Sequence, residues 1–297
     1  MEFVDIKSIA ELHDFFHYGK PIHPLLSVVD LAKVDRSHRK PGVAYRIDLY
    51  SIACKEIQGK FMYGRTTYDF SEGTLMFTAP NQILSPAAEN RVTGWGIYIH
   101  PDFLNASPKG HALMEYSFFG YDMNEALHTS EAEKKVLDDC RQNIERELSN
   151  NLDKHSANLI LMNLEMILGY CSRFYDRQFL TRTNVSNDIV EKFDRLLTNY
   201  FAQHSLIESG VPDVGYFASR LNLSANYLSD LLGKYTGKST YEHIHLKLVE
   251  KAKSLLWSTE NSISEIAYDL GFEHPSHFTK VFKNKTGLSP RQFRNLN

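Results

Sequence analysis

The feature that most constrains this chain is an internal repeat that begins after residue 212. Sliding the segment along itself by 49 residues, and by 50 after the first turn, aligns two copies of one pattern. The aligned pairs are Phe217 with Ile266, Ala218 with Ala267, Leu221 with Leu270, Asn222 with Gly271, Leu228 with Phe278, Leu231 with Val281, Leu232 with Phe282, Thr236 with Thr286 and Gly237 with Gly287. The two segments are therefore expected to share one local structure.

Each copy is predicted to form a helix, a tight turn and a second helix. The first helix is short and has one apolar face. It ends at Asn222 in one copy and Gly271 in the other, and these residue types most readily adopt the left-handed conformation. Ser224 is a natural N-cap for the second helix, whereas Pro275 takes the first helical position in the other copy. The repeat therefore predicts two helix-turn-helix units.

These units cover about residues 213–237 and 263–287, and the segment between them is predicted to be one spacer helix. A capping box formed by Ser239 and Glu242 starts the spacer, and apolar residues follow on one face. A helix of about 17 residues is about 25 Å long. It can hold two reading helices near the ~34 Å that separates successive turns of duplex DNA.

These segments closely resemble the signature of AraC-family transcription regulators. The resemblance covers about residues 213–296 and rests on residues 226–232, 236–239, 263–267, 271–272, 278–283 and 286–294. Many positions agree in order and spacing, so the match is far more specific than a single helix-turn-helix. It implies a sequence-specific DNA-binding regulator with a cupin-like sensor barrel in its N-terminal part.

The residues expected to contact DNA lie opposite the apolar face of each second helix. They are Asn226, Ser229, Asp230, Lys234, Ser276, Thr279, Lys280 and Lys283. The Asn, Ser, Thr and Lys side chains can bond base edges, whereas Lys234, Lys283 and Lys285 are expected at phosphates. Asp230 departs from the family pattern, in which many members carry Arg, so we expect tighter DNA binding by the second unit or greater selectivity of the first. An ordinary solvated helix face is the alternative for each stripe.

Short strands are predicted in the N-terminal part, within residues 45–57, 61–70, 74–77 and 92–99. Frequent Gly and Pro between such strands are typical of a small barrel or sandwich. The family resemblance implies that this region, about residues 20–105, is cupin-like.

Amphipathic helices are predicted next, beginning at Ser130, at Leu159 and at Asp188. The polar segment 181–187 is the predicted linker. An apolar face around residues 161–168 predicts either a dimer seam or packing against the barrel, and the sequence leaves both open. The expected fold class is thus α+β. Its expected domains are a regulatory domain at 1–185, with a helical region at about 125–180, and an all-α DNA-binding domain at 186–297.

Charge and cysteine content agree with two such domains. Residues 210–297 carry 11 Lys+Arg against 8 Asp+Glu, a net of +3, whereas residues 1–209 carry 22 against 28, a net of −6. The three cysteines are far apart in the sequence and favour a reducing compartment. The acidic N-terminus does not resemble a signal peptide, and no apolar run is long enough to cross a bilayer. A cytoplasmic protein without membrane contact is expected.

A cupin-type metal enzyme fused to a DNA-binding domain is the rival prediction. It requires several His and a carboxylate in the barrel, but the strand region offers only His100, with His23 and His38 before it and His111 after it. His243 and His245 lie on the spacer helix, where they diverge by about 200°. We therefore expect no enzyme, no metal and no cofactor. The expected partners are double-stranded DNA, a small-molecule effector, RNA polymerase (for an activator) and a second copy. A regulator controlled by abundance or a protein partner is the third alternative.

Overall fold

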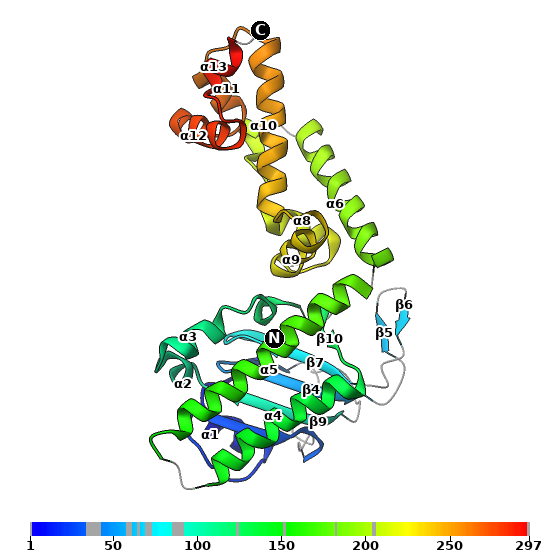
Figure 1. Ribbon diagram of the computed structural model, residues 1–297, viewed down its shortest axis with the longest axis vertical. Helices are drawn as coiled ribbons and strands as arrows, with labels where there is room; N and C mark the ends of the chain where they lie inside the picture. Colours follow the sequence, from blue (N-terminus) through cyan, green and yellow to red (C-terminus); the bar gives the residue numbers. More distant parts are fainter. Residues whose placement is uncertain are drawn as a thin grey trace. The chain divides into compact units, whose positions relative to one another are not determined.

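The computed structural model describes residues 2–33, 43–57, 61–63, 66–68, 73–84, 92–122, 125–150, 153–181, 183–203 and 206–295. The chain divides into two compact units, Met1–Thr181 and Arg182–Asn297. Figure 1 shows strands in the first unit and helices alone in the second. The fold is therefore mixed α/β and mostly helical.

A five-stranded antiparallel sheet forms the centre of the first unit. Its order is β10 (Leu127–His128), β7 (Thr74–Thr78), β4 (Tyr50–Ile57), β9 (Val92–Ile99) and β2 (Leu26–Asp30). Ile52, Cys54 and Ile97 are fully buried on its central strands, which explains why these runs are rich in apolar residues. Two smaller sheets accompany it. They consist of β1 (Glu2–Ile6), β3 (Val43–Ile47) and β8 (Gln82–Leu84), and of β5 (Phe61–Tyr63) and β6 (Thr66–Tyr68).

The predicted strand segments at 45–57, 74–77 and 92–99 are confirmed, and the first of them is split into β3 and β4. Within 61–70 the structure shows the two short strands β5 and β6, and residues 64, 65, 69 and 70 lie outside the described residues. Among the described strands, β2 and β10 remain the two edges of the larger sheet. The described strands thus form open sheets, and the cupin-like barrel is not shown.

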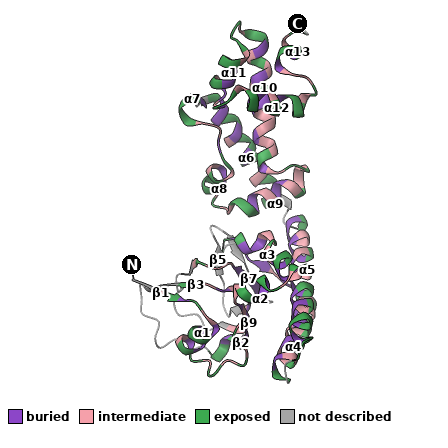
Figure 2. Cartoon of the chain, turned by 90° about the vertical axis from the view of Figure 1, so that its left-hand side faces the viewer, coloured by how far each residue is buried: buried purple, intermediate pink, exposed green. Residues whose placement is uncertain are grey.

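Helices complete the first unit. They are α1 (Ile9–Phe16), α2 (Pro101–Asn105), α3 (Pro108–Met114), α4 (Glu131–Ser149) and α5 (Ser156–Thr181), with short 3-10 turns η1 (Leu31–Lys33) and η2 (Ser117–Gly120). The predicted helices beginning near 130 and 159 are confirmed as α4 and α5. Leu161, Leu164 and Leu168 are buried within the unit, and Figure 2 shows the buried stripe along α5. Of the two alternatives for this apolar face, packing inside the unit is therefore correct and the dimer seam is wrong.

The second unit contains eight described helices. They are α6 (Thr183–Gln203), α7 (Leu206–Ser209), α8 (Val214–Leu221), α9 (Ala225–Thr236), α10 (Thr240–Ser258), α11 (Ile263–Asp269), α12 (Pro275–Thr286) and α13 (Pro290–Arg294). The boundary between the two units, after Thr181, falls inside the predicted linker at 181–187, but the described residues of this segment lie in helices, since α5 continues to Thr181 and α6 begins at Thr183. Ser186 is buried, and α6 packs against α8, α9 and α10. Tertiary packing thus outweighs the weak helix preference of the polar residues.

Candidate nucleic-acid interface

One apolar core holds the helices of the second unit together. Phe217, Phe278 and Phe282 are almost completely buried, together with Leu228 and Leu232. These are the repeat positions that the alignment pairs across the two copies. The repeated apolar pattern therefore encodes the shared core, and the remaining faces of α9 and α12 are left to solvent.

The first helix-turn-helix unit consists of α8 and α9. Asn222 ends α8 in the left-handed conformation, with φ of 56°. The Ser224 hydroxyl accepts the backbone N–H of Tyr227, which caps α9. Gly237 ends α9, again in the left-handed conformation, with φ of 71°. The expected turn, cap and stop residues thus act as predicted.

The second unit consists of α11 and α12 and follows the same plan. Ser262 and Glu265 form the predicted capping box at the start of α11. Gly271 provides the left-handed turn, with φ of 78°. His274 precedes α12 without a side-chain cap, and Pro275 takes the first helical position. Fixed proline geometry therefore replaces the hydroxyl cap of the first unit.

The spacer helix α10 joins the two units. It has 19 residues, which corresponds to a length of about 28 Å. Ser239 and Glu242 form the predicted capping box, and the N–H of Ser239 holds the pKa of the Glu242 carboxyl below its ordinary value. In Figure 1, α8 and α9 lie at the N-terminal end of α10, and α11 and α13 lie beside its later turns. One rigid helix thus carries both helix-turn-helix units.

The predicted contact residues occupy the solvent side of α9 and α12. Asn226, Lys234, Ser276, Lys280 and Lys283 are exposed. Three further contact residues are half-buried, namely Ser229, Asp230 and Thr279. The structure therefore brings each set onto one helix face.

Ser229 and Thr279 have hydrogen-bond partners inside the fold. The Ser229 hydroxyl lies 3.1 Å from the hydroxyl of Thr240, which is fully buried at the start of α10. The Thr279 hydroxyl donates to the carbonyl oxygen of Pro275 at 3.0 Å. Sequence reasoning missed both bonds, because the first depends on how α10 packs against α9. Each hydroxyl oxygen keeps a lone pair for a further donor.

The charges of the two faces differ. Lys280, Lys283 and Lys285 give α12 three ammonium groups. Lys285 Nζ lies 3.7 Å from Glu242 Oε1, so this lysine is tied to the spacer helix. On α9, Asp230 and Lys234 balance each other in formal charge. The favourable potential for a polyanion is therefore concentrated on the second unit.

The two histidines of the spacer point to different neighbours. His243 Nε2 lies 2.7 Å from the Thr236 hydroxyl, and its ring packs against Phe193. The His245 ring packs against the Tyr241 ring in a tilted arrangement, with 4.0 Å between the ring centroids. Burial lowers the pKa of both imidazoles, and Lys285 contributes for His245. Their divergence on the helix is thus confirmed.

The structure also exposes two cations that sequence reasoning had passed over. Lys238 follows the turn that ends α9, and Arg291 lies in the first turn of α13. Both sit just beyond a helix-turn-helix unit, next to the repeated Thr-Gly stop. Their position just after each unit was the feature of the sequence that could have identified them, since no motif marks them. Each is a candidate phosphate contact.

Among the described residues, no group of three or more His, Cys, Asp and Glu side chains is arranged to hold a metal ion. Within those same ranges, no helix combines the length and apolar character needed to cross a bilayer.

Comparisons with known proteins bear on the second unit. The family described as "Helix-turn-helix domain" matches residues 217–296. An uncharacterized HTH-type transcriptional regulator of Bacillus subtilis is 42% identical over 79 residues, which is 27% of this chain and 25% of the relative. The Msm operon regulatory protein of Streptococcus mutans is 38% identical over 81 residues, which is 27% of this chain and 29% of the relative. The matched part thus spans between a quarter and a third of these relatives.

Among solved structures, the chain is similar to the C-terminal domain of AraT, a response regulator from Geobacillus stearothermophilus. The identity is 31%, the coverage is 37% of this chain and 85% of that chain, and the TM-score is 0.32. The matched residues are a DNA-binding helix-turn-helix domain. The second unit therefore carries a helix-turn-helix domain of the AraC type, which confirms the resemblance found in the sequence.

Proposed function

We propose that this protein is a sequence-specific transcription regulator that reads two successive major grooves of DNA. The observation that carries the proposal is the pair of helix-turn-helix units held by the single helix α10. Their second helices, α9 and α12, expose polar and basic side chains. A spacer of about 28 Å suits reading positions that recur every ~34 Å along a duplex.

Each predicted contact residue has a proposed role. Asn226 pairs with adenine and Lys280 with guanine, because these side chains match the base edges in the major groove. Ser229, Ser276 and Thr279 bond base edges through their hydroxyls. Asp230 accepts from a cytosine amino group, and the lysines Lys234 and Lys283 bind phosphates.

The first unit is proposed to be the regulatory part, with a cupin-like arrangement of its sheets and a small-molecule effector. The proposed division of labour is residues 1–185 for regulation and 186–297 for DNA binding. A regulator without a ligand is the alternative, and flat thermal shifts across a metabolite library would favour it. We propose no enzymatic activity, since the relatives are named as regulators.

A homodimer is proposed through an exposed stripe of α5, in place of the buried face considered from the sequence. Leu159, Met162 and Met166 remain 43–51% exposed, and their spacing of three and four residues puts them on one side of the helix. The double variant Met162→Glu/Met166→Glu is expected to give a monomer in analytical ultracentrifugation. A dimer that persists in this variant contradicts the assignment. RNA polymerase remains the proposed partner for activation, in the cytoplasm.

The testing experiment is a selection from random duplex DNA with the full chain. We expect enrichment of a motif with two parts separated by about one helical turn, 10–10.5 base pairs. The matched control is the double variant Lys280→Ala/Lys283→Ala, in which the part read by α12 should lose enrichment. Failure of the full chain to enrich any motif contradicts the proposal.

A further inference from the structure

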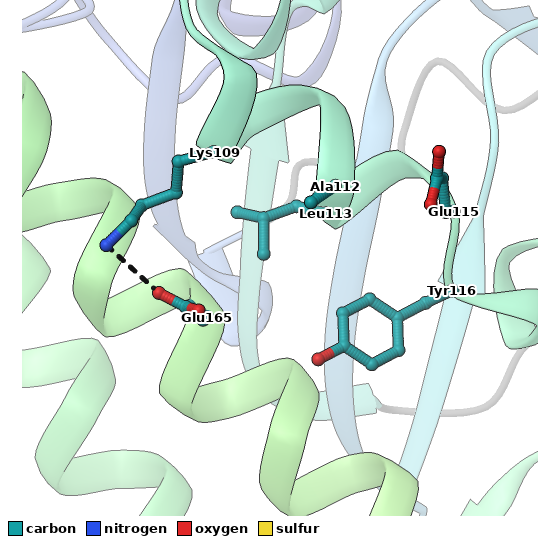
Figure 3. Close-up of a pocket in the computed structure, with 6 residues that line it drawn as sticks. All are labelled: Lys109, Ala112, Leu113, Glu115, Tyr116 and Glu165. Carbon is teal, nitrogen blue, oxygen red and sulfur yellow. Dashed lines mark ion pairs between the residues drawn. The ribbon is translucent and has the colours of Figure 1, made fainter.

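A surface pocket of about 340 Å³ lies in the first unit, between α3 and α5. Its lining residues are Lys109, Ala112, Leu113, Glu115, Tyr116 and Glu165, drawn in Figure 3. The α3 wall is held in place by its own packing. The Ser107 hydroxyl caps α3, and a Cβ at Gly110 would overlap the carbonyl oxygen of Leu104. This close approach fixes α3 against α2, so the pocket has a preformed side.

The charged groups of the pocket are unequal in number. Lys109 Nζ forms an ion pair with Glu165 Oε2 at 3.1 Å, which links α3 to α5 across the opening. The second carboxylate, Glu115, is exposed and has no ion pair within the described ranges of the chain. Because Lys109, the lysine among the described lining residues, is already paired with Glu165, the charge left for a ligand is the negative charge of Glu115.

The neutral lining suits the same kind of ligand. The Tyr116 side chain points toward α5 in Figure 3, and its ring packs against Phe118 at 5.1 Å between centroids. Burial and the nearby Glu165 raise the pKa of the Tyr116 hydroxyl, so it is protonated at neutral pH. A phenol ring attracts a cation to its face. Leu113 is almost completely buried and supplies an apolar floor.

We propose that this pocket binds a small organic amine. The ammonium group pairs with the Glu115 carboxylate at the rim of the pocket, and the carbon skeleton covers Leu113 and the Tyr116 ring. A carboxylic acid would have to displace Glu165 from Lys109, whereas an amine meets a carboxylate that has no ion-pair partner among the residues that the structure describes. The pocket volume is at the small end of ligand sites, so the ligand is a compact amine rather than a large one. The proposal that an amine binds here depends on these residues alone. Only the further idea that the amine regulates DNA binding rests on the proposed function.

The test is isothermal titration of the full chain with n-pentylamine, 1,5-diaminopentane and tyramine. Hexanoate and 3-(4-hydroxyphenyl)propanoate serve as acids of matching skeleton. We expect saturable binding of at least one amine and none of the acids. Glu115→Gln keeps the shape of the side chain and is exposed, so the fold should survive. It should weaken amine binding about tenfold, as expected for loss of one charge-assisted contact.

Glu147→Gln is the matched control, since Glu147 lies on α4 outside the pocket lining. It should leave the affinity unchanged. Absence of saturable amine binding, equal weakening in the control, or preference for the acids would each overturn the proposal. DNA selection by the full chain is a separate readout. If amines bind while no DNA motif is enriched, the pocket assignment stands and the proposed function fails.

Discussion

The two helix-turn-helix units share a backbone plan but differ in the chemistry of their exposed faces. Thr236 and Thr286 end α9 and α12 in the same way, because each hydroxyl donates to the carbonyl four residues earlier, at 2.7 Å and 2.8 Å. The outward positions 230 and 280, by contrast, carry Asp and Lys. The positions that agree are those required by the helix ends and the core. The positions that differ lie on the outer faces of the helices. The fold places few constraints on the side chain there, so DNA recognition can determine which residue is present.

The largest expected effect concerns the turns of the two units. Gly271 has a left-handed φ of 78°, and a Cβ there would lie 2.7 Å from the carbonyl oxygen of Leu206. Gly271→Ala should therefore reduce the local unfolding free energy of α11 and α12 by about 2–3 kcal/mol. Hydrogen exchange of their amides measures this free energy.

The matched variant is Asn222→Ala in the first unit, where φ is 56°. The Cβ is already accommodated there, so the expected cost is about 1 kcal/mol. If the two substitutions reduce the unfolding free energy equally, the close approach of Gly271 to α7 does not contribute to the cost.

The next effect concerns DNA binding by α12. Lys280→Ala should cost about 1–3 kcal/mol of operator affinity and relax specificity at one base pair, if this lysine reads a guanine. Lys283→Ala should weaken binding to all sequences and reduce the salt slope by about 1, as expected for a phosphate contact. Fluorescence anisotropy with the selected operator and single-base variants measures both. If neither variant changes affinity, the recognition face has been placed wrongly.

A smaller effect is expected from equalising the charge of the two units. Asp230→Arg changes the charge of α9 by two units and should raise affinity for unrelated duplexes, with a salt slope steeper by about 1–2. The measurement is anisotropy on a non-operator duplex over a salt series. A fall in operator affinity would instead show that the carboxylate makes an essential base contact.

The smallest effect concerns acid stability. Position 243 carries His and its repeat counterpart, position 293, carries Phe. Burial lowers the pKa of His243 below its ordinary value. The unfolded chain therefore binds a proton near pH 6.5 that the native state binds only at lower pH. This contribution to stability is complete above that pH and is lost as the pH falls through it toward the native pKa.

His243→Phe should accordingly reduce the loss of stability between pH 7 and pH 5, as measured by urea denaturation followed by circular dichroism. An unchanged pH dependence would mean that other groups, such as His245, account for the acid sensitivity.

The sequence alone determined most of the second unit. The repeat, the turn residues Asn222 and Gly271, and the capping boxes predicted its helices because local propensity and the pattern of burial agree there. The resemblance to AraC-type domains also came from the sequence, because many residues agree with that family in order and spacing. What the sequence could not determine was where polar side chains find partners, as with Ser229 and Thr240, since these contacts join different helices.

In the first unit the sequence predicted several strands and helices, and only the tertiary structure decided what their faces pack against. From the sequence, Leu161, Leu164 and Leu168 could equally have packed against a second copy or against the sheet. An apolar helix face indicates that it is buried, but not which surface buries it. The polar segment 181–187 looked like a linker, yet Ser186 is buried in a helix, since packing adds more than local propensity removes. The pocket on α3 and α5 joins residues more than fifty positions apart, from Lys109 to Glu165. Such a pocket forms only when the two helices pack together, so the pattern of apolar residues along the sequence does not predict it.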